Sequence, residues 1–168
     1  MTVTIRPATA ADARAMGRLG AVLVQTHHEF DAARFIAATP QTEHGYASYL
    51  GSQLKKDDII LLVAEDGGDV LGYTFAGIEG YDYMELRGPA GVLYDIVVDP
   101  AHRGRGIGAA LLDATLAELT TRGAPRVVLS TAERNESAQR LFARAGFRRT
   151  MIEMTRELDG SPGERQLD

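Results

Sequence analysis

An apolar strand, a glycine-rich loop and an Ala/Leu-rich helix follow one another in the second half of the chain. The strand is predicted at 92–98 and the helix at 106–121, and the loop before the helix reads Arg103-Gly104-Arg105-Gly106-Ile107-Gly108. Glycine adopts positive φ and lets a ligand approach the main chain, and the first N–H groups of a helix have no partner within it. They lie at the positive end of the helix dipole, and the two arginines add charged donors. The pattern predicts a phosphate-binding loop.

Two other glycine-rich phosphate loops fit this segment less well. A Walker-type loop needs Gly-Lys-Ser/Thr at the start of the helix, which is absent here. The dinucleotide fingerprint matches the letters Gly104-x-Gly106-x-x-Ala109, but the run 99–103 separates these glycines from the strand. Its acidic ribose ligand, expected about 20 residues further on, would fall near Ser130 and Thr131. A dinucleotide is therefore the second choice of ligand.

A second block of residues follows the loop in the order of a known family. It reads Asn135-Glu136-Ser137-Ala138, then Leu141-Phe142, then Ala145-Gly146-Phe147. With the segment 95–108 it resembles the GNAT family, the Gcn5-related N-acetyltransferases. The acyl-CoA loop of that family reads Gln/Arg-x-x-Gly-x-Gly/Ala, which corresponds to Arg103, Gly106 and Gly108. The resemblance covers residues 58–155 and implies an α/β (α+β) fold of the GNAT type, a mixed, mostly antiparallel sheet flanked by helices.

Hydrophobic periodicity and turn residues predict the remaining elements. Strands are predicted at 3–6, 59–65, 70–78, 92–98, 126–131 and 147–155. Helices are predicted from 9 to about 24 and at 44–55, 106–121 and 136–145, with a short helical stretch at 31–37. We expect one domain over 1–158 and a loose polar tail at 159–168.

Composition and charge exclude several classes of protein. The chain has 168 residues, enough for a real core, and 45% of them are hydrophobic, which is typical of a globular protein. It contains no apolar run of the roughly 20 residues that span a bilayer, and residues 1–6 do not resemble a signal peptide. The absence of cysteine excludes disulfides and thiolate chemistry. The net charge of −5 disfavours nucleic acid as a partner. We expect a cytoplasmic protein without membrane contact.

The resemblance implies where acetyl-CoA would bind. The main chain of Ile96, Val97 and Val98 would pair with the pantetheine arm as an added strand. The pyrophosphate would lie on the loop residues Arg103, Gly104, Arg105, Gly106, Ile107 and Gly108. Asn135 would reach the pantetheine or thiol end. Because Asn135 precedes a predicted helix, a plain N-cap role stays open for it.

Two positions depart from the family pattern. Phe142 stands where many members have a Tyr that protonates the departing thiolate, and a phenyl ring has no proton to donate. A thiol with a pKa of roughly 8.5 can leave without that help. Ser130 stands where N-terminal acetyltransferases of the ribosomal-protein type carry Glu, which disfavours a protein N-terminus as acceptor.

An amine that attacks directly needs a group to take its proton. The candidate catalytic residues are Asp95 and Tyr94 in the central strand and Glu79 at the end of the strand before it. Strand alternation puts Tyr94 and Asp95 on opposite faces unless a bulge intervenes. The predicted substrate pocket is lined by Phe30, Tyr81 and Tyr83, although packed surface tyrosines are the alternative for the last two. No metal site is expected, because His27 and His28 diverge on a helix.

These patterns together predict an acetyl-CoA-dependent N-acetyltransferase. The acetyl group would move to a primary amine within a ternary complex, because no cysteine is present to carry it. A small-molecule amine is the expected acceptor. A protein lysine or N-terminus is one alternative, and a non-catalytic CoA-binding regulatory module is another. Homodimerisation through an edge strand or the C-terminal strands is left open.

Overall fold

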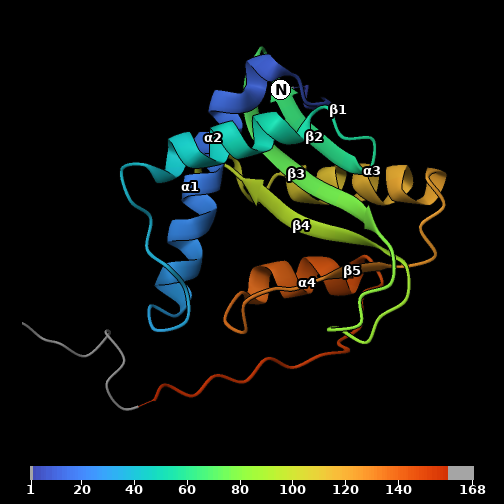
Figure 1. Ribbon diagram of the computed structural model, residues 1–168. Helices are drawn as coiled ribbons and strands as arrows, with labels where there is room; N and C mark the ends of the chain where they lie inside the picture. Colours follow the sequence, from blue (N-terminus) through green and yellow to red (C-terminus); the bar gives the residue numbers. More distant parts are fainter. Residues whose placement is uncertain (1, 159–168) are drawn as a thin grey trace, which may run out of the picture.

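Five strands form one sheet in the order β1-β2-β3-β4-β5, and the computed structural model describes residues 2–158 of the chain. Figure 1 shows the strands and the helices around them. The strands are β1 (Thr4–Pro7), β2 (Ile59–Asp66), β3 (Asp69–Glu79), β4 (Ala90–Val98) and β5 (Val127–Leu129). The helices are α1 (Ala13–Phe30), α2 (Thr42–Gln53), α3 (Ile107–Thr121) and α4 (Glu136–Arg144), with short 3-10 turns η1 (Ala10–Asp12) and η2 (Pro100–His102).

The sheet is mixed and mostly antiparallel, as predicted. Strands β1 to β4 pair antiparallel in chain order. Strand β5 pairs parallel with β4, and only through Gly91–Leu93 against Val127–Leu129. The second half of β4 therefore extends past the end of β5, and the two strands part at that point.

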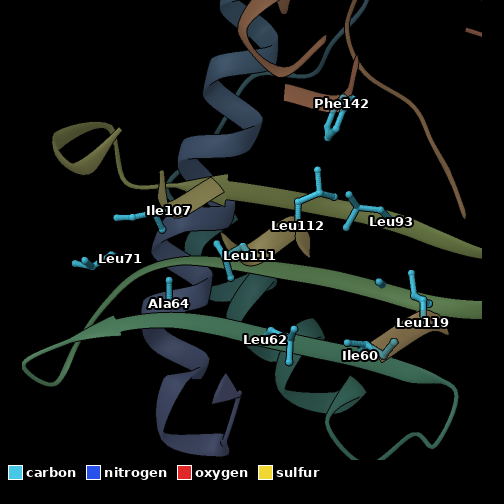
Figure 2. Packing of buried hydrophobic residues seen from close by; sticks show 11 residues of the cluster. Ile60, Leu62, Ala64, Leu71, Leu93, Ile107, Leu111, Leu112, Leu119 and Phe142 are labelled. Atoms are coloured by element: carbon cyan, nitrogen blue, oxygen red, sulfur yellow. The ribbon is translucent and has the colours of Figure 1, made fainter. Parts of the chain in front are cut away.

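Alternating apolar side chains give the sheet two buried faces. Ile60, Leu62 and Ala64 of β2 point to α3 and α4, whereas Leu61 and Val63 point to α1 and α2. Figure 2 shows the first of these clusters, with side chains of α3 against the sheet and Phe142 of α4 above Leu93. Burying each large aliphatic side chain stabilises the fold by about 1.5–3 kcal/mol, and both layers of helices are held in this way.

A bulge interrupts the alternation in β4. Phe75 pairs with Asp95 and Ala76 pairs with Leu93, so Tyr94 is an extra residue between them. Leu93 stays in the cluster under α3 and α4. Tyr94 and Asp95 both turn to the α1/α2 face, where the Tyr94 ring lies 4.7 Å from the Phe75 ring. The bulge thus decides the alternative left open by the sequence, because it brings both side chains to one face.

Two predicted elements are wrong. Residues 147–155 form no strand, and every residue from 148 to 158 is exposed. A strand pattern shows only that a segment is suited to pairing, and residues 147–158 pair with no strand in the described part of the chain. The helix predicted at 31–37 is also absent. Instead α1 continues to Phe30, and the Asp31 carboxylate then accepts bonds from the main-chain N–H groups of Ala33 and Arg34 in a turn.

The predicted polar tail at 159–168 lies outside the described residues. Within residues 2–158, no helix is both long and apolar enough to cross a membrane.

Candidate functional site

The glycine-rich loop leads from the end of β4 into α3. Gly104 and Gly106 have φ values of +75° and +81°, in the left-handed region that L-residues avoid. Gly106 is also the N-cap of α3, and no side chain caps the first turn there. The first-turn N–H groups of α3 are therefore directed toward an exposed loop, in the geometry that favours a bound phosphate.

The other predicted loop residues have different surroundings. The Ile107 side chain is buried in the core, so only its main-chain N–H faces the loop. Gly108 has room for a Cβ, which would lie 3.6 Å from Leu141. Arg103 is exposed, and its Nε donates to the carbonyl of Val98 at 3.1 Å. Arg105 is exposed on the same loop.

A pocket of about 300 Å³ lies where β4 and β5 part. Residues of α1, α2, β4, β5 and α4 line it. Its polar lining consists of His27, Tyr46, Tyr94, Asp95, Ser130, Thr131 and Asn135. Its apolar lining includes Leu93, Ile96, Leu129, Ala138 and Phe142.

Asp95 is the carboxylate of this pocket. The Tyr73 hydroxyl, fully buried in the α1/α2 cluster, donates to Asp95 Oδ2 at 3.0 Å. Burial raises the pKa of Asp95, and the hydrogen bond from Tyr73 and the nearby His27 offset this only in part. A carboxylate with a raised pKa at the wall of a pocket is suited to accept a proton from a ligand.

His27 of α1 also faces the pocket, and the sequence analysis considered it only as a metal ligand. Its Nδ1 lies 2.9 Å from the Leu23 carbonyl, and since a carbonyl only accepts, Nδ1 carries the proton. The ring packs edge-on against Phe35, 5.2 Å away. A signal for this placement existed, because His27 continues the apolar helical stripe of Met16, Leu19 and Leu23.

Tyr46 of α2 is the second lining residue that the sequence analysis missed. Burial raises its pKa to about 12, with a further contribution from the charge of Asp95. It is the only polar contribution of α2 to the pocket lining among the described residues. The α2 pattern carries little amphipathic signal, so this tyrosine could not be assigned to a site from the sequence.

Tyr94 and Glu79 form a separate network at the edge of the pocket. The Tyr94 hydroxyl donates to Glu79 Oε1 at 2.6 Å, and Arg87 donates to Glu79 Oε2 at 2.6 Å. These bonds lower the pKa of Glu79, whereas burial and Glu79 raise the pKa of Tyr94. Glu79 is therefore a weaker base than Asp95, and its partners are already side chains of the protein.

The predicted substrate residues do not converge on the pocket. Tyr81 and Tyr83 are exposed and stack on each other with ring centroids 6.3 Å apart. Neither Tyr belongs to the pocket lining, and Phe30 does not either. Phe30 lies behind His27, with the rings 6.0 Å apart. The surface-tyrosine alternative therefore describes Tyr81 and Tyr83 better.

Asn135 caps a helix and also lines the pocket, so the N-cap role is confirmed and the cofactor role stays a prediction. Its Oδ1 accepts the N–H of Ala138 at 3.2 Å and caps α4, while the residue also lines the pocket. Phe142 is buried, and its ring packs against Phe147 with centroids 5.9 Å apart. Within the described part of the chain, no three His, Asp or Glu side chains are grouped to hold a metal ion.

Comparisons with known proteins agree with this architecture. The sequence profile of the acetyltransferase (GNAT) family matches residues 23–147. The chain is 38% identical over 96 residues to a mycothiol acetyltransferase from Thermobispora bispora, across 55% of this chain and 31% of the relative. It thus spans about a third of the length of that curated relative.

Two solved structures have the same fold. One is a GCN5-related N-acetyltransferase from Ralstonia eutropha, with a TM-score of 0.71 and 26% identity over 95% of this chain and 100% of the other. The second is a predicted acetyltransferase with acetyl-CoA from Clostridium acetobutylicum, with a TM-score of 0.71 and 16% identity over 92% of this chain and 96% of the other.

Proposed function

The chain belongs to the acetyltransferase (GNAT) family, and on that premise we propose that it moves an acetyl group from acetyl-CoA to the primary amine of a small molecule. The observation that carries this proposal is the placement of Asp95. Its half-buried carboxylate, held by Tyr73, lies in a pocket that opens where β4 and β5 part. The predicted phosphate loop begins at the far end of the same strand.

The residues present fit the donor. The clostridial structure contains acetyl-CoA on this fold, and acetyl-CoA supplies a thioester that an amine can attack. In this chain the first-turn N–H groups of α3 and the exposed arginines of the loop would hold its pyrophosphate. The second half of β4, Ile96–Val98, lies beyond the end of β5 and would pair with the pantetheine amides. Asn135 would face the thiol end.

Asp95 would prepare the acceptor. An amine enters the pocket as an ammonium ion and must lose a proton before it attacks. Asp95 would bind that ion and take the proton, and Tyr73 would hold the carboxylate in place. His27 and Tyr46 would line the acceptor side. As the C–N bond forms, the C–S bond breaks and the thiolate leaves; Phe142 has no proton to give, so water would supply it.

The pocket favours a small acceptor. Its volume is about 300 Å³, and Asp95 is the carboxylate in its lining, which suits a single small ammonium ion. The Thermobispora relative is a mycothiol acetyltransferase. Its small-molecule product class supports a small-molecule acceptor here as well. A protein lysine or N-terminus is the alternative acceptor, and binding without transfer is the alternative function.

Ligand-dependent unfolding tests the donor. Acetyl-CoA or CoA at 100 times its dissociation constant should stabilise the chain by about 2.7 kcal/mol, a shift of a few degrees, whereas NADH and ATP should not. Gly106→Glu should abolish the shift, because it adds charge and a side chain at positive φ. Gly123→Glu is the matched control, since Gly123 has the same φ of +81°, also lies in open space and follows the other end of α3. A shift with NADH alone would contradict the proposal.

Turnover tests the transfer. A panel of small primary amines and lysine peptides, with acetyl-CoA, should release thiol only when a small amine is present. Release that depends on a peptide would instead favour the protein acceptor. A chain that binds CoA but releases no thiol with any amine would favour the regulatory module.

A further inference from the structure

Two buried glycines lie where the local structure favours another residue. Gly20 lies inside α1 and Gly77 inside β3. Glycine within a helix or strand costs about 0.5–1 kcal/mol relative to alanine, because it loses more conformational freedom on folding. Neither glycine has a positive φ, so the main chain does not require glycine at either place. The reason for each must lie in what packs against it.

Gly20 faces the ring of Tyr46. A Cβ at Gly20 would lie 2.2 Å from Cδ1 and 2.4 Å from Cγ of that ring, far inside contact distance. The Tyr46 ring of α2 therefore rests directly on the main chain of α1. From there it lines the pocket and packs against the apolar cluster under these two helices. The position of the ring depends on the absence of a side chain at Gly20.

Gly77 faces the ring of Tyr94 in a similar way. A Cβ at Gly77 would lie 3.0 Å from both Cε2 and the hydroxyl oxygen of Tyr94, and 3.1 Å from Cδ1 of Ile59. The Tyr94 ring lies across β3, with the Phe75 ring 4.7 Å from it at one end. At the other end its hydroxyl donates to Glu79 at 2.6 Å. The missing side chain at Gly77 gives the ring room to lie on the sheet.

The two tyrosines belong to different walls of one pocket. Tyr46 comes from the helix layer and Tyr94 from the sheet, and both line the pocket that contains Asp95. A side chain at Gly20 would push the Tyr46 ring off α1. A side chain at Gly77 would lift the Tyr94 ring off the sheet. In both cases the ring would move into the space between the helices and β4, which is the acceptor side of the pocket.

We propose that Gly20 and Gly77 determine which amines the pocket admits, because each leaves room for a tyrosine ring in the pocket wall. The inference rests on the proposed function, since it concerns the acceptor of the transfer. Neither glycine lines the pocket itself, so both act as positioning residues through the tyrosines. One methylene in an apolar pocket changes discrimination between substrates by about 10- to 200-fold. Carbon atoms added at these glycines should therefore exclude wide amines and spare narrow ones.

Acceptor preference in single variants tests this role. The ratio of kcat/KM for benzylamine to that for ethylamine should fall by about tenfold or more in Gly20→Ala and in Gly77→Val. The KM for acetyl-CoA should stay within about threefold of wild type, because the phosphate loop is untouched. Gly51→Ala is the matched control, since a Cβ there lies between the same two helices at an ordinary 3.7 Å from Ala13. It should keep the wild-type ratio.

Smaller side chains in place of the rings separate pocket width from damage to the fold. Gly20→Ala combined with Tyr46→Leu, and Gly77→Val combined with Tyr94→Leu, should regain the wild-type ratio or exceed it. A loss through general destabilisation would instead persist or grow in the double variants. If Gly20→Ala does not fold, Tyr46→Leu alone should raise the ratio, because it widens the pocket. An unchanged ratio in Tyr46→Leu would overturn the proposal.

Fluorine NMR of the chain labelled with fluorotyrosine reports the ring positions without turnover. Tyr46→Phe and Tyr94→Phe assign the two resonances. The first should shift in Gly20→Ala and the second in Gly77→Val, and neither should shift in Gly51→Ala. Resonances that stay in place would overturn the proposal, and so would resonances that shift while the amine ratio is unchanged.

Failure of the proposed function has a different signature. A wild-type chain that acetylates no amine would contradict the transfer itself. Calorimetric binding of benzylamine and ethylamine to the complex with CoA then replaces the kinetic ratio. A binding preference that falls in Gly20→Ala and Gly77→Val would support the role of the two glycines, and an unchanged preference would overturn it.

Discussion

Asp12 is buried and Asp95 is half-buried, and their pKa values move in opposite directions. Asp12, at the corner between β1 and α1, is 6% exposed and meets Arg6 through two bonds of 2.8 and 2.9 Å. The Thr9 N–H adds a third at 2.7 Å, and the pKa of Asp12 falls to about 2. Asp95, at the pocket, receives the Tyr73 hydroxyl, and burial raises its pKa.

The difference separates a structural carboxylate from one that is available to a ligand. At the β1–α1 corner a guanidinium and a main-chain N–H match the charge of Asp12, so that corner is stabilised by it. At the pocket a single neutral hydroxyl bonds to Asp95, and the charged form stays under-compensated. A protein that keeps such a group gives up stability for a site that can bind a cation or take a proton.

The largest expected effect is on turnover in Asp95→Asn. Loss of the proton acceptor should lower kcat by about 100- to 10,000-fold, the usual contribution of a general base. Binding of CoA should stay unchanged, because Asp95 does not belong to the phosphate loop. Steady-state kinetics and ligand-dependent unfolding measure the two quantities. A kcat within threefold of wild type would remove Asp95 from the mechanism.

The same variant should gain stability at neutral pH. A raised native pKa means that wild-type stability is fully present below the ordinary carboxyl pKa and is lost as the pH rises through the native pKa of Asp95. Asn has no such titration, so urea unfolding at pH 7 should favour the variant. If Asp95→Asn instead lowered the free energy of unfolding at pH 7 together with kcat, Asp95 would be a structural residue like Asp12.

The next effect is on stability in Asp12→Asn. The lowered pKa means that the contribution is present above pH 4 and is lost as the pH falls toward about 2. The free energy of unfolding of the variant at pH 7 should be about 2 kcal/mol lower than that of wild type. Solvent screening at the partly exposed Arg6 keeps the loss from being larger. Urea unfolding at pH 7 and pH 3 should show a flatter pH dependence than wild type. Turnover of the folded variant should match wild type, and a loss of kcat would break the comparison.

The smallest effect is expected in Tyr73→Phe. The Tyr73 hydroxyl lowers the pKa of Asp95 through its hydrogen bond, so its removal should raise that pKa further. A bond worth about 1 kcal/mol should move the acid limb of the pH–rate profile up by somewhat under one unit. Tyr94→Phe is the control, since its hydroxyl bonds to Glu79. An acid limb that moves with Tyr94 alone would assign it to Glu79.

Local patterns predicted the loop and most of the elements, because they depend on few neighbouring residues. Gly104 and Gly106 sit at positive φ as their place before a helix required. The pocket was harder to predict, because His27 and Tyr46 reach it from separate helices. The prediction of a strand at 147–155 was wrong for a different reason. The alternation of a sequence shows that a segment can pair in a sheet, but not which strand it would pair with.

The bulge in β4 has a consequence for how chains of this kind diverge. Tyr94 is the residue of β4 that has no pairing partner on β3. A chain lacking it would therefore keep Leu93 and Asp95 on their present faces. The sheet absorbs the extra residue locally, and the rest of the strand keeps its register. A change in length by one residue at this point therefore adds or removes an aromatic side chain beside the pocket. A change elsewhere in β4 would turn every side chain beyond that point to the opposite face.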